Sequence, residues 1–160
     1  ARVVVFAEDG TERALGQSVG RGSSWRHVIV CAGFTGSGLE LLSVCTPHIG
    51  GVVEFYALEE GKMEIVAQLS GFTSHVVGTR NLDMALAGDF DGDGSLEVLL
   101  PNQERTHLAA IGRNARSAQR LWQVDLGGQM KTNLTAAVLA DGKMLVGAAH
   151  AGQRLRIWGP

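Results

Sequence analysis

The chain has 160 residues, of which 45% are apolar and 19% are charged, and its formal net charge is −2 at pH 7. This composition is typical of a globular protein with enough apolar material for a core, and it argues against a disordered chain. Lysine and arginine are scattered, so the sequence lacks the basic stripe that nucleic-acid binding requires. No apolar run approaches the roughly 18 residues of a membrane-spanning helix, and we expect neither nucleic-acid binding nor membrane insertion.

The chain starts with Ala1 and enters an apolar segment at Val3, with no initiator methionine and no signal peptide. We therefore expect an internal piece of a longer protein, or a processed protein. Residues 2–7 and 12–19 are short and apolar enough to form strands. We interpret residues 1–22 as the outer strands of a unit that precedes the rest.

Residues 23–72 form the first complete unit that the sequence predicts. Four short apolar segments alternate with glycine-rich turns, which indicates hairpins. These segments lie at residues 27–34, 39–45, 52–58 and 63–69. Two cysteines, Cys31 and Cys45, lie in the apolar segments and are too few for a disulfide framework. We expect two small buried side chains, with a bridge between neighbouring strands as the alternative.

The same pattern returns in residues 73–128 and again, incompletely, in residues 129–160. Residues 31–42 correspond to residues 87–99, which have one residue more and carry acids in the loop. The later segments lie at residues 82–89, 96–100, 107–112 and 119–126, and then at 134–139, 144–149 and 154–158. Trp122 and Trp158 stand late in these segments, and we expect both to pack against neighbouring strands.

This organisation predicts an all-β fold. The segments show no sustained helical period, and the 22 glycines suit many tight turns. Four antiparallel strands recurring at a period of about 50 residues are typical of a β-propeller blade. About three units do not close a ring, so residues 1–160 are predicted to be one segment of a larger propeller. Its neighbours would then be the remaining blades or other chains.

The loop of the second unit carries alternating acids. Asp89, Asp91 and Asp93 stand at positions 1, 3 and 5, and Gly92 and Gly94 allow the backbone to curl tightly. Calcium takes six to eight oxygen ligands, and such a loop can supply them together with the Ser95 carbonyl and the Glu97 carboxylate. The loop is not an EF-hand, because Leu100 stands where that motif needs a glutamate. The alternative is a solvated acidic turn without an ion.

The corresponding loops of the other units lack these acids. Gly33, Thr35 and Ser37 replace the three aspartates in the first unit, and the loop of the third unit has shortened to residues 140–143. We therefore predict one Ca²⁺ site.

The stretch from Gly88 to Leu99, with its Asp-x-Asp-Gly-Asp-Gly core, resembles the FG-GAP/VCBS-type repeat of integrin α subunits and many bacterial secreted proteins. The resemblance covers about 50 residues well, and the rest in degenerate form. It implies a propeller with a Ca²⁺ site between the first two strands of a blade, at Asp89, Asp91, Asp93, Ser95 and Glu97. The family usually has aspartate at the last of these positions. It implies no particular activity, because one fold hosts many functions.

A second group of candidates lies on the opposite face of the predicted blades. His48, Asn102 and His150 follow the second strand of successive units, and His75 and Arg80 lie in a connection between units. Trp25, Arg26, His27 and Asn81 accompany them. The hypothesis is a glycan or protein ligand at this face, and the alternative is that these are turn residues and strand-end caps.

Three functions follow from these features. The first is a calcium-binding module that serves as a binding or scaffold domain of an extracellular, periplasmic or cell-surface protein, where calcium is abundant. The second is part of a lyase-like, polysaccharide-degrading enzyme with a structural or substrate-bridging Ca²⁺. The third is a structural unit without a ligand. The enzyme is the less favoured hypothesis, because the sequence contains no zinc-ligand spacing, P-loop or nucleophile elbow, and we name no catalytic residue.

Overall fold

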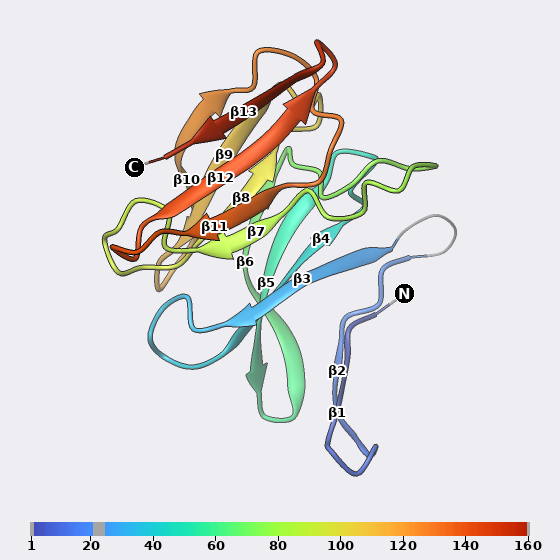
Figure 1. Cartoon of the computed structure of the whole chain (residues 1–160). Helices are drawn as coiled ribbons and strands as arrows, with labels where there is room; N and C mark the ends of the chain where they lie inside the picture. Colours follow the sequence, from blue (N-terminus) through green and yellow to red (C-terminus); the bar gives the residue numbers. More distant parts are fainter. Residues whose placement is uncertain (1, 21–24, 160) are drawn as a thin grey trace.

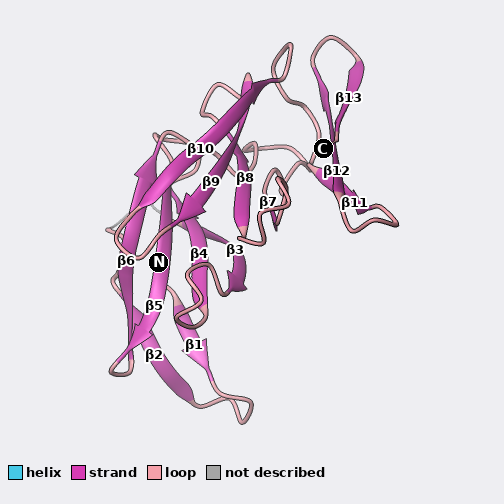
Figure 2. Cartoon of the chain, turned by 90° about the vertical axis from the view of Figure 1, so that its left-hand side faces the viewer, coloured by secondary structure: helices cyan, strands magenta, loops and turns pink. Residues whose placement is uncertain are grey.

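The computed structural model describes residues 2–20 and 25–159, and in these residues it contains thirteen strands and no helix (Figures 1 and 2). The predicted all-β class is therefore confirmed. No helix able to cross a membrane occurs in the described residues. The predicted boundary between residues 1–22 and 23–72 falls within residues 21–24, outside the described part.

The first sheet has six strands in the order β1-β2-β6-β5-β4-β3. Its members are β1 (Val4–Phe6), β2 (Glu12–Gly16), β3 (Arg26–Ala32), β4 (Glu40–Cys45), β5 (Val52–Glu59) and β6 (Lys62–Ser70). The β5–β6 hairpin turns through Glu60 and Gly61, which have φ angles of 47° and 80°. Two consecutive positive φ angles produce the turn whose twist matches that of the flanking strands. The first hairpin joins the sheet through a parallel pairing of β2 with β6.

The second sheet has four strands in the order β10-β9-β8-β7, and the third has the order β11-β12-β13. They comprise β7 (Leu86–Gly88), β8 (Glu97–Pro101), β9 (His107–Arg113), β10 (Ala118–Asp125), β11 (Thr135–Val138), β12 (Met144–His150) and β13 (Arg154–Trp158). The strand predicted at residues 82–89 is much shorter than expected. Part of its backbone bonds elsewhere: Met84 N–H donates to Ser74 O, and Asp83 O accepts from Leu134 N–H.

The second sheet packs between the other two. Val98 and Leu100 point to one face, and they share an apolar cluster with Leu42 and Phe55 of the first sheet. Leu99 points to the other face, and it packs in a cluster with residues of the third sheet. All five residues of β8 are buried for this reason, and each large apolar side chain contributes about 1.5–3 kcal/mol to stability. In Figure 2 the first sheet lies at the lower left and the third at the right.

The cysteine prediction is wrong for Cys31. Cys45 is buried as expected, but Cys31 is exposed, and both are free thiols. The reason is topological: β3 is an edge strand, and one of its faces is open to solvent. The alternative of a bridge also fails, because the two cysteines lie at opposite ends of the β3–β4 pairing. The packing role of Trp122 and Trp158 is confirmed, since both lie against the cluster between the second and third sheets.

Candidate metal centre

The acidic loop connects β7 to β8 as a β-hairpin, which agrees with the exclusion of an EF-hand. Gly92 and Gly94 have φ angles of 80° and 86°, a region that residues with a side chain rarely adopt. The backbone folds back on the aspartates: Gly92 N–H and Gly94 N–H donate to the two oxygens of Asp89 at 2.7 and 3.0 Å. These bonds hold the loop in a tight curl with its carboxylates on the inside.

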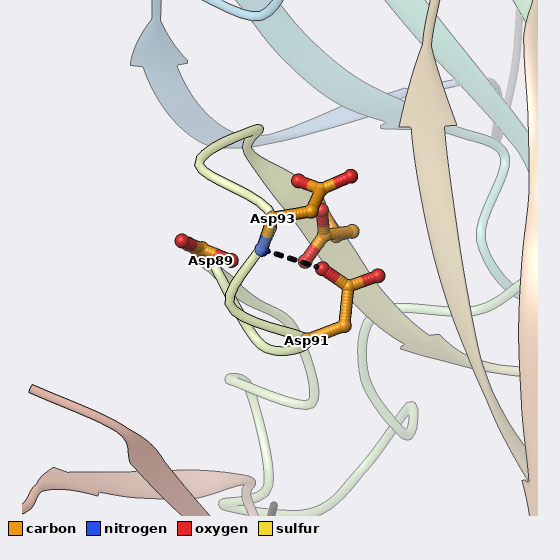
Figure 3. Close-up of side chains that lie close together, drawn as sticks. Asp89, Asp91 and Asp93 are labelled. Carbon is orange, nitrogen blue, oxygen red and sulfur yellow. Dashed lines mark hydrogen bonds between the residues drawn. The ribbon is translucent and has the colours of Figure 1, made fainter.

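Four carboxylates converge in this curl. One oxygen from each of Asp89, Asp91, Asp93 and Glu97 lies within 4.8 Å of all the others. Figure 3 shows the three aspartates on the loop. Asp91 accepts a hydrogen bond from Asp93 N–H at 3.2 Å, and Asp93 accepts one from Ser95 N–H at 2.7 Å. Ca²⁺ binds oxygens at 2.3–2.6 Å, so oxygens separated by less than 5 Å can share one ion. This group can therefore hold a metal ion.

Glu97 is the unusual member of the group. It is fully buried, whereas Asp91 and Asp93 are exposed. Its Oε2 accepts a hydrogen bond from Phe90 N–H at 2.8 Å, but its buried Oε1 has no hydrogen-bond partner in the part of the chain that the structure describes. Burial raises the pKa of the Glu97 carboxyl, and the negative charges of Asp91, Asp93 and Asp89 raise this pKa further, against the lowering effect of the Phe90 bond. A buried carboxylate without compensation is costly, and a cation would remove that cost.

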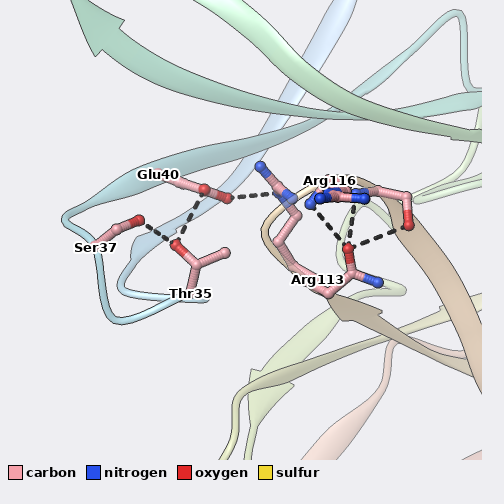
Figure 4. A network of polar contacts seen from close by, with 7 residues as sticks. Thr35, Ser37, Glu40, Arg113 and Arg116 are labelled. Atoms are coloured by element: carbon pink, nitrogen blue, oxygen red, sulfur yellow. Dashed lines mark hydrogen bonds and ion pairs between the residues drawn. The ribbon is translucent and has the colours of Figure 1, made fainter.

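The other buried glutamates show how this fold compensates such a charge. Glu40 pairs with Arg113 at 3.1 Å, and Glu54 pairs with Arg26 at 2.6 Å. No ion pair to Glu97 occurs in residues 2–20 and 25–159. Glu40 is the residue that corresponds to Glu97 in the sequence repeat. In Figure 4 the guanidinium of Arg113 occupies one side of Glu40, and Thr35 occupies the other.

Arg113 was not among the residues that the sequence singled out. It closes β9 and reaches Glu40 from the neighbouring sheet. The sequence did contain a sign that Glu40 needs a cationic partner. The first unit keeps the glutamate of the loop but has lost the aspartates, so the buried charge of Glu40 needs a cation from within the chain. The pairing of two distant residues cannot be read from one sequence. The Ser95 carbonyl remains a predicted ligand, and the described contact of Ser95 is its N–H bond to Asp93.

A cavity of about 520 Å³ adjoins the acidic loop. Asp89, Phe90 and Asp91 line one side, and the turn between β11 and β12 lines the other with Asp141 and Lys143. Lys143 is paired with Asp141 at 3.6 Å. The loop thus lies at the junction of the second and third sheets.

The predicted ligand-binding residues divide into two sets. His48 and His75 come together, with ring centroids 4.4 Å apart, and Trp25 and His27 complete a cluster of rings. Ser74, which the sequence did not single out, is fully buried and bonds to the Nδ1 atoms of His27 and His75 at 2.8 and 3.1 Å. Burial lowers the pKa of His75 to about 4, with the neighbouring His48 and His27 adding to the effect.

Arg80, Asn102 and His150 have no described contact with this ring cluster. Asn102 caps its own turn, because its Oδ1 accepts from the N–H groups of Thr106 and His107 at 2.9 and 3.0 Å. His150 Nδ1 accepts from Gly152 N–H at 3.1 Å, and Arg80 is an exposed loop residue. Their contribution to a ligand site stays a prediction.

Comparison with known protein families, curated proteins and solved structures finds no match to this chain.

Proposed function

We propose that this chain is a calcium-binding β-propeller module, with Asp89, Asp91, Asp93 and Glu97 as carboxylate ligands and the Ser95 carbonyl as a further ligand. The observation that carries the proposal is Glu97: within residues 2–20 and 25–159 its buried Oε1 has no partner, while Glu40 and Glu54 each have an arginine. The ion binds only the folded loop, and it therefore stabilises the fold by mass action.

Calcium fits this ligand set better than a softer metal. All donors are hard oxygens, and neither histidine nor cysteine belongs to the group. The loop also offers more carboxylates than Mg²⁺ usually takes from a protein. Because the loop lacks the bidentate twelfth ligand of an EF-hand, the proposal includes an extracytoplasmic location, where calcium is abundant.

The propeller part of the proposal is supported by the stacking of the sheets. The second sheet is covered on both faces, as a blade between two neighbours would be. The third sheet exposes Leu155 and Ile157 on its outer face, which suits packing against further blades or another chain. The FG-GAP/VCBS-type sequence of the loop agrees with this arrangement. The module would then act as a scaffold or binding domain, with the ring cluster around His75 as the candidate surface for a glycan or protein ligand.

Thermal unfolding with and without calcium tests the proposal. At a calcium concentration 100 times the Kd, stabilisation is about 2.7 kcal/mol, which raises the Tm by roughly 5–10 °C for a chain of this size. We expect this rise for the wild type and for Asp9→Asn, a control whose aspartate also accepts a hydrogen bond in a turn, from Thr11 N–H. We expect no rise for Asp91→Asn. Equal responses of the two variants would refute the site.

A further inference from the structure

The side chain of Glu97 lies on the face of the second sheet that the third sheet covers. Glu97 pairs directly with Gly88 across the β7–β8 ladder, so both residues face the same side. A Cβ atom added to Gly88 would lie 2.8 Å from Met144 Sδ in the third sheet. Leu99, two residues along β8 and therefore on the same side, packs in the cluster that includes Val146 of β12.

Glu40 occupies the matching place one sheet earlier. Leu42, two residues further along β4, packs in the cluster between the first and second sheets. Arg113 belongs to the second sheet and reaches Glu40 across this interface at 3.1 Å. In the first interface, a cation supplied by the neighbouring sheet thus neutralises a buried glutamate.

The second interface has the glutamate without the arginine. The third sheet contributes Asp141 and Lys143 to the cavity beside the acidic loop, and the described ion pair of Lys143 is with Asp141. Four carboxylates therefore lie at this junction, and one of them, Glu97, has a buried oxygen with no hydrogen-bond partner among the described residues. Without a cation, the repulsion among these carboxylates and the burial of Glu97 act against the packing at this junction.

We propose that the ion at Glu97 stabilises the contact between the second and third sheets (the fastening). It neutralises Glu97 at this interface, as Arg113 neutralises Glu40 at the first. This inference rests on the proposed cation site. With the ion bound, Glu97 stays buried and the contact between Gly88 and Met144 is maintained. Without the ion, the third sheet is the first part of the chain to loosen, while the first interface is unaffected because its cation is covalently part of the protein.

Hydrogen exchange of the full chain, compared in 1 mM CaCl₂ and in EDTA, tests the inference. Fastening predicts at least fivefold slower exchange in residues 135–158 when calcium is present, together with slower exchange in the loop. Exchange in β4 and β5 should not change. Calorimetry on the same sample measures binding separately. If calcium binds but slows exchange only in residues 86–101, the fastening is overturned and the proposed function is not. If calcium does not bind, both the proposed function and the fastening are overturned.

Met144→Lys provides a complementary test. It places a cation on the third sheet opposite Gly88, where it can take the role that Arg113 has for Glu40. We expect residues 135–158 of this variant to be protected in EDTA as well, and the response of these residues to calcium to fall below twofold. Met144→Gln, which adds no charge, should keep the calcium response of the wild type. If exchange in residues 135–158 responds equally to calcium in the lysine and glutamine variants, the fastening is contradicted. If Met144→Lys does not fold, the exchange of the wild-type chain tests the fastening.

Discussion

Glu97 differs from the other buried glutamates of the described chain in what neutralises it. Arg26 and Arg113 serve Glu54 and Glu40, with bonding distances of 2.6 and 3.1 Å. For Glu97, the neighbours within reach are three further carboxylates and one backbone N–H. The same residue type in the same position of a repeat thus has an internal cation as its partner in one unit, and in the next it belongs to a carboxylate group that could hold a metal ion.

The Glu40–Arg113 pair gives a prediction for stability. Arg113→Met leaves a buried carboxylate without its cation, and we expect a loss of about 3–5 kcal/mol in the free energy of unfolding, measured with urea. Adding Glu40→Gln to this variant removes the unpaired charge, so the double variant should be more stable than Arg113→Met alone. A double variant at least as unstable as the single one would show that the charge is not the cause.

His75 predicts a pH dependence. The folded state lowers the pKa of His75 to about 4, while an unfolded histidine has a pKa of about 6.5, so the unfolded chain binds more protons between these values. The free energy of unfolding should therefore not depend on His75 above pH 6.5. Between pH 6.5 and pH 4 it should fall with decreasing pH, by at most about 1.4 kcal/mol per pH unit for this one group. The rings of His27 and His48 face His75. Burial lowers the pKa of His27, and the charge of Asp83 partly offsets that lowering.

Urea unfolding from pH 7 to pH 5 in EDTA measures this slope without interference from bound calcium. His75→Phe keeps an aromatic ring in the cluster and removes the titrating group, so its stability should fall less steeply with decreasing pH. An unchanged slope would mean that His75 does not titrate as its surroundings indicate.

At the scale of elements, the sequence located most strands within one or two residues. Short apolar segments separated by turn residues made β5, β6, β9 and β13 predictable, and the Glu60-Gly61 turn marked the β5–β6 hairpin. It did not predict the shortness of β7, because Asp83 and Met84 bond to segments distant in sequence. Nor did it predict the exposure of Cys31, because an apolar run looks the same in an edge strand as in a central one.

The burial of β8 on both faces leads to a prediction at this scale. Leu99 is fully buried between the second and third sheets, so Leu99→Ala should lower the free energy of unfolding by about 2–5 kcal/mol. Leu155 is 66% exposed on the third sheet, and Leu155→Ala should change stability by no more than about 0.5 kcal/mol. Urea unfolding of the 160-residue chain measures both, and similar losses would contradict the packing described for β8.

At the scale of the whole molecule, three sheets pack face to face, and each junction has a buried glutamate that faces the next sheet. The sequence predicted the convergence of the four carboxylates from their spacing alone, since it is a local feature of one loop. It could not predict that this loop lies against the third sheet, because that depends on the register of β8 and on the packing of Met144 beside Gly88. The carboxylate group of the loop was therefore predictable from the sequence, but its position between the second and third sheets was not.

The most direct test is isothermal titration calorimetry of the calcium-free chain with CaCl₂. A calcium site at the acidic loop predicts saturable binding with a stoichiometry of one ion per chain, weakened at least tenfold in Glu97→Gln, which removes the buried charge and retains the shape of the side chain. It also predicts that Glu40→Gln binds calcium like the wild type, since Arg113 already neutralises Glu40. The absence of saturable binding, or equal affinity in the wild type and Glu97→Gln, would rule out calcium binding at Glu97.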